Sequence, residues 1–180
     1  MGDTVSSRRL FAVLVFVLLG GCTSDPASGS TVPAEPSIVR TPGGATITLP
    51  IESPVEHQVD GLREQFRSAD GAVWSVQVLD RTATGAGESI EEVAIALCHR
   101  IELGEIAGEL THRACTFAGQ PAQCVDGWQA GRDGDRVTRR GAILRLGDDT
   151  VWISLAAREG TVAIDPLATS LADETRVTLQ

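Results

Sequence analysis

Hydrophobic and polar residues alternate along several stretches of the chain, which is the pattern of a strand with one buried face. The clearest early stretch, residues 72–79, places Trp74, Val76 and Val78 on one side. Further strands are predicted over residues 109–118, 121–130, 136–146 and 150–158. Short turns rich in Gly and Asp separate these later strands, so the pattern predicts an antiparallel meander. The most apolar stretch, 150–158, is expected at the centre of the sheet.

A helical period replaces the alternation at residues 89–103. Ser89 and Glu92 have the spacing of a capping box, in which each residue bonds the backbone of the other. The apolar residues that follow recur every three or four positions, and Gly104 is a suitable end. We therefore predict a helix over 89–103.

A second helix is predicted over about 166–175, with Asp165 as its cap and Pro166 in its first turn. Two short strands are expected near residues 45–51 and 62–67. The predicted fold class is α+β: an antiparallel sheet of about six to seven strands covered by two helices, as in an α/β/α sandwich. These elements form one domain over residues 45–180.

The first residues of the chain have the features of an export signal. Arg8 and Arg9 precede Leu10–Leu19, a ten-residue apolar stretch. A helix of that length, at ~1.5 Å per residue, covers about half of the ~30 Å hydrocarbon core of a bilayer. Residues 1–21 therefore indicate a cleaved signal peptide.

The end of this stretch, Leu19-Gly20-Gly21-Cys22, resembles the lipobox of bacterial lipoproteins. The resemblance implies diacylglycerol on the Cys22 sulfur, cleavage before Cys22 and acylation of the new amino terminus. Residues 22–44 are rich in Pro, Gly, Ser and Thr, which predicts a disordered tether.

The net charge of the chain limits the classes of partner that it can bind. A net charge of −9 and a pI near 4.7 argue against nucleic acid, because phosphate backbones require clustered positive charge. An acidic domain is also repelled by anionic headgroups, so the lipid itself must hold the protein at the membrane. All 15 basic residues are Arg, which suggests a GC-rich genome and, with the lipobox, an actinobacterium.

The order of the predicted elements resembles the PsbP/Mog1-like fold, which is attributed to actinobacterial lipoproteins of the LpqN kind. The residues that carry the resemblance are Ala118-Gly119-Gln120-Pro121-Ala122 and the closing segment 150–173. It covers roughly residue 45 to the end of the chain. It implies an α+β sandwich and supplies no shared catalytic residue.

If Cys22 is acylated, three other cysteines remain. A hairpin centred between Gly119 and Gln120 places Cys115 opposite Cys124, and an exported protein meets oxidising conditions, so these two are predicted to form a disulfide. Cys98 lies on the apolar face of the first helix and is expected to be a buried free thiol. A bond from Cys98 to either of the others, or redox activity, is the alternative.

The sequence contains no recognisable set of catalytic residues. Its three histidines, His57, His99 and His112, lack metal-ligand spacing, and no familiar nucleophile motif occurs. We therefore nominate no catalytic residue, no metal site and no cofactor. Five arginines gather around one predicted hairpin and are expected to form one basic face on this acidic protein. That face is either a solvated strand surface or a docking patch for an anionic partner or lipid headgroup: Arg132, Arg136, Arg139, Arg140 and Arg145.

These observations favour a non-enzymatic, lipid-anchored envelope protein on the outer face of the cytoplasmic membrane. Its partners would be the membrane and an envelope protein or lipid, and the domain is expected to be monomeric. The alternative is a binder of small molecules or lipids between the sheet and the helices. An envelope ester hydrolase is the least supported hypothesis, because no Ser–His pair can be nominated.

Overall fold

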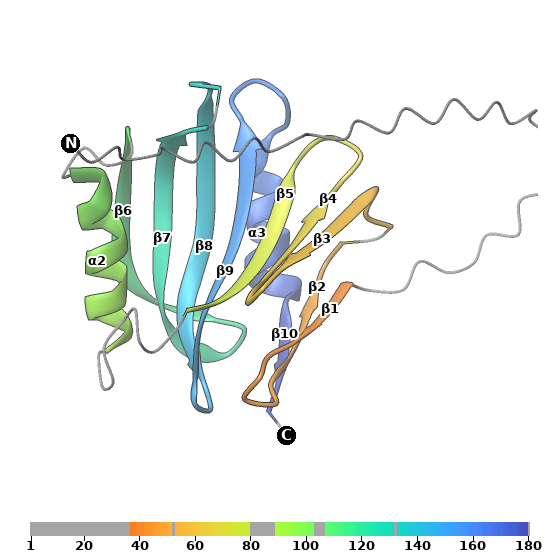
Figure 1. The fold of residues 1–180 in the computed structure, drawn as a ribbon, viewed down its shortest axis with the longest axis vertical. Helices are drawn as coiled ribbons and strands as arrows, with labels where there is room; N and C mark the ends of the chain where they lie inside the picture. Colours follow the sequence, from red (N-terminus) through yellow and green to blue (C-terminus); the bar gives the residue numbers. More distant parts are fainter. Residues whose placement is uncertain (1–36, 52, 80–88, 103–106, 132, 180) are drawn as a thin grey trace, which may run out of the picture. The chain divides into compact units, whose positions relative to one another are not determined.

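The computed structural model describes residues 37–51, 53–79, 89–102, 107–131 and 133–179 (Figure 1). The predicted signal peptide, Cys22 and most of the predicted tether lie outside these residues. In the described part, no helix is long and apolar enough to cross a bilayer.

A seven-stranded antiparallel sheet forms the larger part of the fold, in the order β3-β4-β5-β9-β8-β7-β6. Its strands are β3 (Glu56–Asp60), β4 (Arg63–Arg67), β5 (Val73–Leu79), β6 (Gly108–Phe117), β7 (Gln120–Ala130), β8 (Arg136–Leu146) and β9 (Asp149–Arg158). The meander β6–β9 and the central place of β9 are confirmed. The edge strand β3 was not predicted, because its side chains are mostly exposed and show no alternation.

A second, three-stranded sheet has the order β1-β2-β10. Its strands are β1 (Ser37–Arg40), β2 (Thr46–Leu49) and β10 (Arg176–Thr178). The fold is α+β as predicted, but the sequence did not predict this sheet. β1 lies inside the segment assigned to the tether, 22–44, so that boundary was wrong. The reason is the buried Val39, which pairs with Ile47 in register and joins the core.

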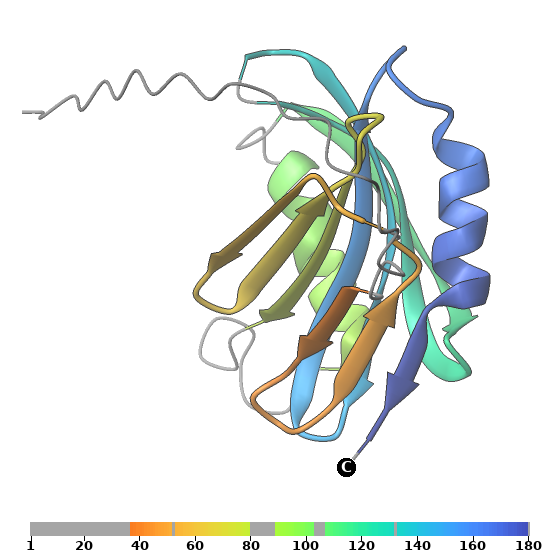
Figure 2. The same ribbon diagram turned by 90° about the vertical axis from the view of Figure 1, so that its right-hand side faces the viewer.

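The two faces of the seven-stranded sheet pack against different partners (Figure 2). On one face, Trp74, Ile153 and Leu155 form a core with the three-stranded sheet and α3 (Ile164–Glu174). On the other face, Val125 and Ile143 pack against α2 (Ile90–Glu102). We call these the α3 face and the α2 face. Because side chains alternate along a strand, each of the central strands contributes to both cores.

The predicted helix over 89–103 is confirmed as α2. The backbone N–H of Glu92 donates to Ser89 Oγ at 3.2 Å, and the Ser89 N–H donates to Glu92 Oε2 at 2.7 Å. This reciprocal pair is the predicted capping box, and it satisfies two N–H groups that the helix itself cannot pair. The bond from Ser89 lowers the pKa of the Glu92 carboxyl.

The second helix begins earlier than predicted. Its cap is Ala163, which makes no side-chain bond, so the assignment of Asp165 as the cap was wrong. Asp165 lies in the first turn, and its carboxylate contacts Arg140 Nη2 at 2.9 Å instead of the helix backbone. Leu171 on this helix is buried and belongs to the core.

The centre of the sheet should dominate stability. Ile153 on β9 is fully buried, so Ile153→Ala should lower the free energy of unfolding by about 2–5 kcal/mol through lost contacts and a residual cavity. Ile95→Ala on α2 is the matched control, because Ile95 is 48% exposed and should cost less than about 0.5 kcal/mol. Urea unfolding measures both, and equal effects would contradict the assigned core.

Candidate functional site

The predicted docking patch does not form one basic face. Arg136, Arg139, Arg140 and Arg145 all lie on β8, where successive residues point to opposite sides of the sheet. Arg136 and Arg140 fall on the α3 face, and Arg139 and Arg145 on the α2 face. Arg132 lies outside the described residues. The interpretation of a single face is therefore corrected, and a docking role for individual arginines stays a prediction.

On the α3 face, Arg140 links the sheet to the helix. Its Nη1 atom contacts Asp126 Oδ2 on β7 at 2.5 Å, and its Nη2 atom contacts Asp165 Oδ1 on α3 at 2.9 Å. Both carboxylates are at least half exposed, so solvent screens these pairs and they contribute little to stability. Their effect is to hold the Arg140 guanidinium beside the first turn of α3.

A cleft of about 390 Å³ lies beside this ion pair, between α3 and strands β6–β8. Its lining includes Arg113, Phe117, Cys124, Arg140, Ala168 and Leu171. Asp126, Asp165 and Asp173 also belong to the lining, and the first two pair with Arg140. Arg113, the other cation of the lining, stands next to the apolar side chains, an arrangement suited to a ligand with a negative head and an apolar body. Sequence analysis did not nominate Arg113, because only the hairpin register brings it beside Cys124.

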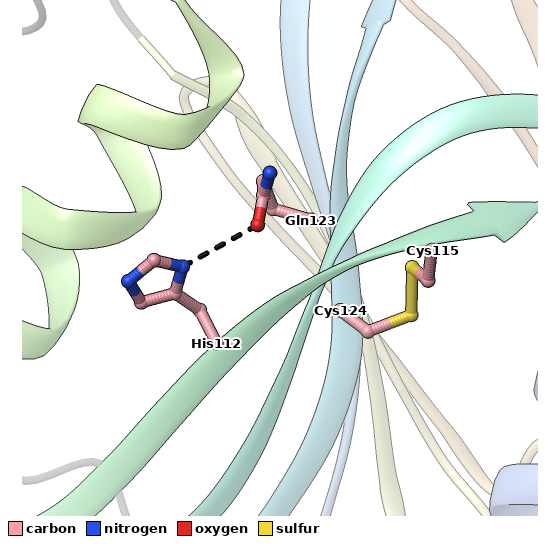
Figure 3. The surroundings of a disulfide bond; sticks show 4 residues. All are labelled: His112, Cys115, Gln123 and Cys124. Atoms are coloured by element: carbon pink, nitrogen blue, oxygen red, sulfur yellow. Dashed lines mark hydrogen bonds between the residues drawn. A yellow bond between two sulfur atoms is a disulfide. The ribbon is translucent and has the colours of Figure 1, made fainter.

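The predicted disulfide, Cys115–Cys124, is present on the same face, with Cα atoms 5.8 Å apart (Figure 3). The predicted register was wrong. The turn is Ala118-Gly119, both with positive φ, and Cys115 is opposite Ala122. A two-residue turn of this type matches the twist of the strands. The cysteines are thus diagonal neighbours, close enough to bond in a twisted hairpin.

The opposite face of this hairpin carries His112 and Gln123, whose side chains are 3.3 Å apart between Nδ1 and Oε1 (Figure 3). They lie toward α2, on the side of the sheet away from the disulfide. Cys98 is buried on α2 and takes no part in a disulfide, so it retains its thiol as predicted.

Also on the α2 face, the Arg139 guanidinium lies over the indole of Trp152, 5.6 Å from the ring centroid. Burial, together with the smaller effect of the nearby charge of Arg63, lowers the pKa of Arg139 to about 10. Arg63 donates from Nε to Ser75 Oγ at 3.3 Å. Sequence analysis missed Arg63, because β4 and β8 are distant in the chain and are brought to one face only by the strand order.

At one end of the sheet, Arg158 contacts both carboxylates of the turn between β7 and β8. Its Nη2 atom is 3.1 Å from Asp133 Oδ2, and its Nη1 atom is 2.8 Å from Asp135 Oδ2. A cavity of about 330 Å³ adjoins this cluster. Within the residues that the structure describes, no group of three or more acidic, His or Cys side chains is arranged to hold a metal ion.

The histidines do not converge on one site. His57 lies on β3 and His112 on β6, which are the two edge strands of the seven-stranded sheet. His57 stacks on Phe66 with ring centroids 4.4 Å apart, and its Nε2 atom is 3.1 Å from Glu64 Oε2. His99 is on α2. Each histidine therefore belongs to a different local environment.

No protein-family model and no curated protein sequence matches the chain. Among solved structures, the fold is similar to that of LpqN from Mycobacterium tuberculosis, a protein involved in cell envelope biogenesis. The TM-score is 0.46 and the identity 17%, over 80% of this chain and 91% of that chain. A Pseudomonas aeruginosa protein of unknown function is similar with a TM-score of 0.42 and 13% identity, over 70% and 85% of the two chains. These similarities concern the fold.

The disulfide closes a short loop, so its removal should have a moderate effect. Replacing both Cys115 and Cys124 with Ser should lower the free energy of unfolding by about 2–3 kcal/mol, because the unfolded chain regains conformational freedom. Dithiothreitol should lower the unfolding midpoint of the wild-type protein and leave that of the double variant unchanged. A reductant effect of the same size in both proteins would contradict the assignment.

Proposed function

We propose that this chain is a lipid-anchored protein of the bacterial cell envelope, whose domain binds a partner on the outer face of the cytoplasmic membrane. The observation that carries the proposal is the cysteine at the end of the apolar stretch, in Leu19-Gly20-Gly21-Cys22. A thiolate is the nucleophile suited to thioether formation. Two or three acyl chains, at ~0.8 kcal/mol per buried methylene, hold a protein far more firmly than one chain.

The folded domain is consistent with export. A disulfide between Cys115 and Cys124 persists in oxidising compartments and is rare where thiols are kept reduced. The pair joins two strands that are already neighbours in the sheet, so it reinforces the hairpin without being needed to define the fold. This placement supports a compartment outside the reducing cytoplasm.

Binding is favoured over catalysis by what the two faces of the sheet present. The α3 face offers a cleft with Arg113 and Arg140 in its lining, and the α2 face offers Arg63 and Arg139. Arginines recognise anionic groups through fixed hydrogen-bond donors. His57 and His112, which would be candidate bases, are held on opposite edge strands and contact Glu64 and Gln123 rather than a nucleophile.

The second candidate function is binding of a small amphipathic molecule, and the cleft beside α3 favours it. Its volume of about 390 Å³ falls within the range of ligand sites, about 300–1,000 Å³. The apolar wall, with Phe117 and Leu171, would take an acyl or ring system, and Arg113 would take an anionic head.

The anchor is tested by Cys22→Ser. The variant should no longer be acylated or processed at residue 22, because serine lacks the thiol that forms the thioether, and metabolic labelling with a fatty acid should show no incorporation. Cys98→Ala is the matched control, since it removes another cysteine and should leave labelling unchanged. Undiminished labelling of Cys22→Ser would contradict the proposal.

The second candidate function is tested by a substitution that fills the cleft. Ala168→Trp on α3 should abolish binding of the fluorescent fatty acid cis-parinaric acid, because the indole would occupy the space beside Phe117. Ala96→Trp, at an exposed position of α2, should bind the fatty acid like wild type. If wild type does not bind it, or both variants do, the second candidate function is wrong.

A further inference from the structure

On the α2 face, Arg63 and Arg139 lie on opposite sides of a row of small side chains and near its opposite ends. The row runs across the sheet from Ser75 to Ser154 and then to Gly141. Arg63 belongs to the next row on one side, opposite Gln77. Arg139 belongs to the next row on the other side, opposite Ala156. The two long side chains thus flank the smallest residues of this face.

The contacts of both guanidinium groups turn them toward that row. Arg63 Nε donates to Ser75 Oγ at 3.3 Å, so the side chain reaches from β4 over β5. Arg139 reaches from β8 over β9, where its guanidinium lies on the Trp152 ring. Trp152 is the residue opposite Gln77 and is two positions from Ser154. The guanidinium of Arg63 thus lies at Ser75 on β5 and that of Arg139 at Trp152 on the neighbouring strand β9, and the charge of Arg63 is near enough to disfavour that of Arg139.

No carboxylate compensates this pair among the residues that the structure describes. Four other arginines do have acidic partners: Arg67 with Glu56, Arg136 with Glu159, Arg140 with Asp126, and Arg158 with Asp133. In a chain of net charge −9, two facing arginines without an acid are an arrangement that an anion would stabilise. Within the same described part, Arg139 Nε and Trp152 Nε1 are buried donors with no acceptor.

We propose that this cluster, Arg63 and Arg139 over Ser75 and Ser154, is a binding site for a phosphate group. A phosphate presents oxygens in several directions, so it can accept from two guanidinium forks and from hydroxyls at once. The serines, which are 4% and 2% exposed, form the floor, and the arginines remain partly open to solvent. A free phosphate ester and the headgroup of a phospholipid both present this group.

This site is separate from the α3 cleft, because the two lie on opposite faces of the sheet. It also does not depend on acylation of Cys22. A domain without an anchor would still bind phosphate, and an anchored domain would still be an envelope protein without this site.

The test is isothermal titration calorimetry of the full-length protein in an uncharged detergent. One arm uses inorganic phosphate, and the other uses glycerophosphoglycerol, the soluble diester headgroup of phosphatidylglycerol. Arg63→Gln and Arg139→Gln should each weaken binding about tenfold or more, because each removes charge-assisted hydrogen bonds. Arg136→Gln is the matched control: Arg136 also lies over an indole, that of Trp128, but has an acidic partner.

Saturable binding that is lost in Arg63→Gln and Arg139→Gln and kept in Arg136→Gln supports the site. Binding of the diester alone identifies a lipid headgroup as the source, and binding of inorganic phosphate identifies a free phosphate. No binding in either arm, or equal weakening in all three variants, overturns the proposal. Arg63 is partly exposed, so its variant should fold; an unchanged far-ultraviolet circular dichroism spectrum checks this.

Discussion

The strict alternation of side chains in a sheet that is covered on both faces is the constraint on which this structure depends. Along β9, Ile153 and Leu155 enter the core under the three-stranded sheet, while Trp152 lies on the side of α2. β8 obeys the same rule, with Leu144 on one side and Ile143 on the other. A register shift of one residue would move every one of these side chains to the wrong core.

The same constraint decides what each polar residue can do. Arg139 and Arg140 are neighbours in the sequence, yet Arg140 binds two carboxylates beside α3 and Arg139 lies over Trp152 on the far side of the sheet. The protein therefore presents two basic sites of different character. One is an ion-paired rim of an amphipathic cleft, and the other is a pair of arginines over buried hydroxyls. In the first, Arg140 is already paired with Asp126 and Asp165, and the second is the proposed phosphate site.

Much of the fold could be predicted because its signals are local. The capping box at Ser89, the periodicity of α2 and the alternation of β6–β9 each lie within a few consecutive residues. The disulfide pair was predicted correctly, but the predicted strand register was wrong by two residues. The sequence does not distinguish a turn at Ala118-Gly119 from one at the next pair of residues. The positive φ of Ala118 is the unexpected feature, because turns of this type favour Gly, Asn or Asp there.

What could not be predicted depends on pairing between distant segments. β1 and β10 are short strands from opposite ends of the domain that join only through β2, so neither carries a convincing pattern of its own. The positions of Arg63 and Arg113 beside the candidate sites could not be predicted for the same reason. Their neighbours, Ser75 and Cys124, are contributed by the strand order and the hairpin register.

The intact mass of the protein extracted from membranes shows whether a disulfide-bonded domain is carried on an acylated cysteine. We expect a chain that begins at Cys22, carries the mass of a diacylglyceryl group with or without a further acyl chain, and is two hydrogens lighter than its fully reduced form. A chain that retains residues 1–21, or one that begins elsewhere and carries no lipid, would contradict it.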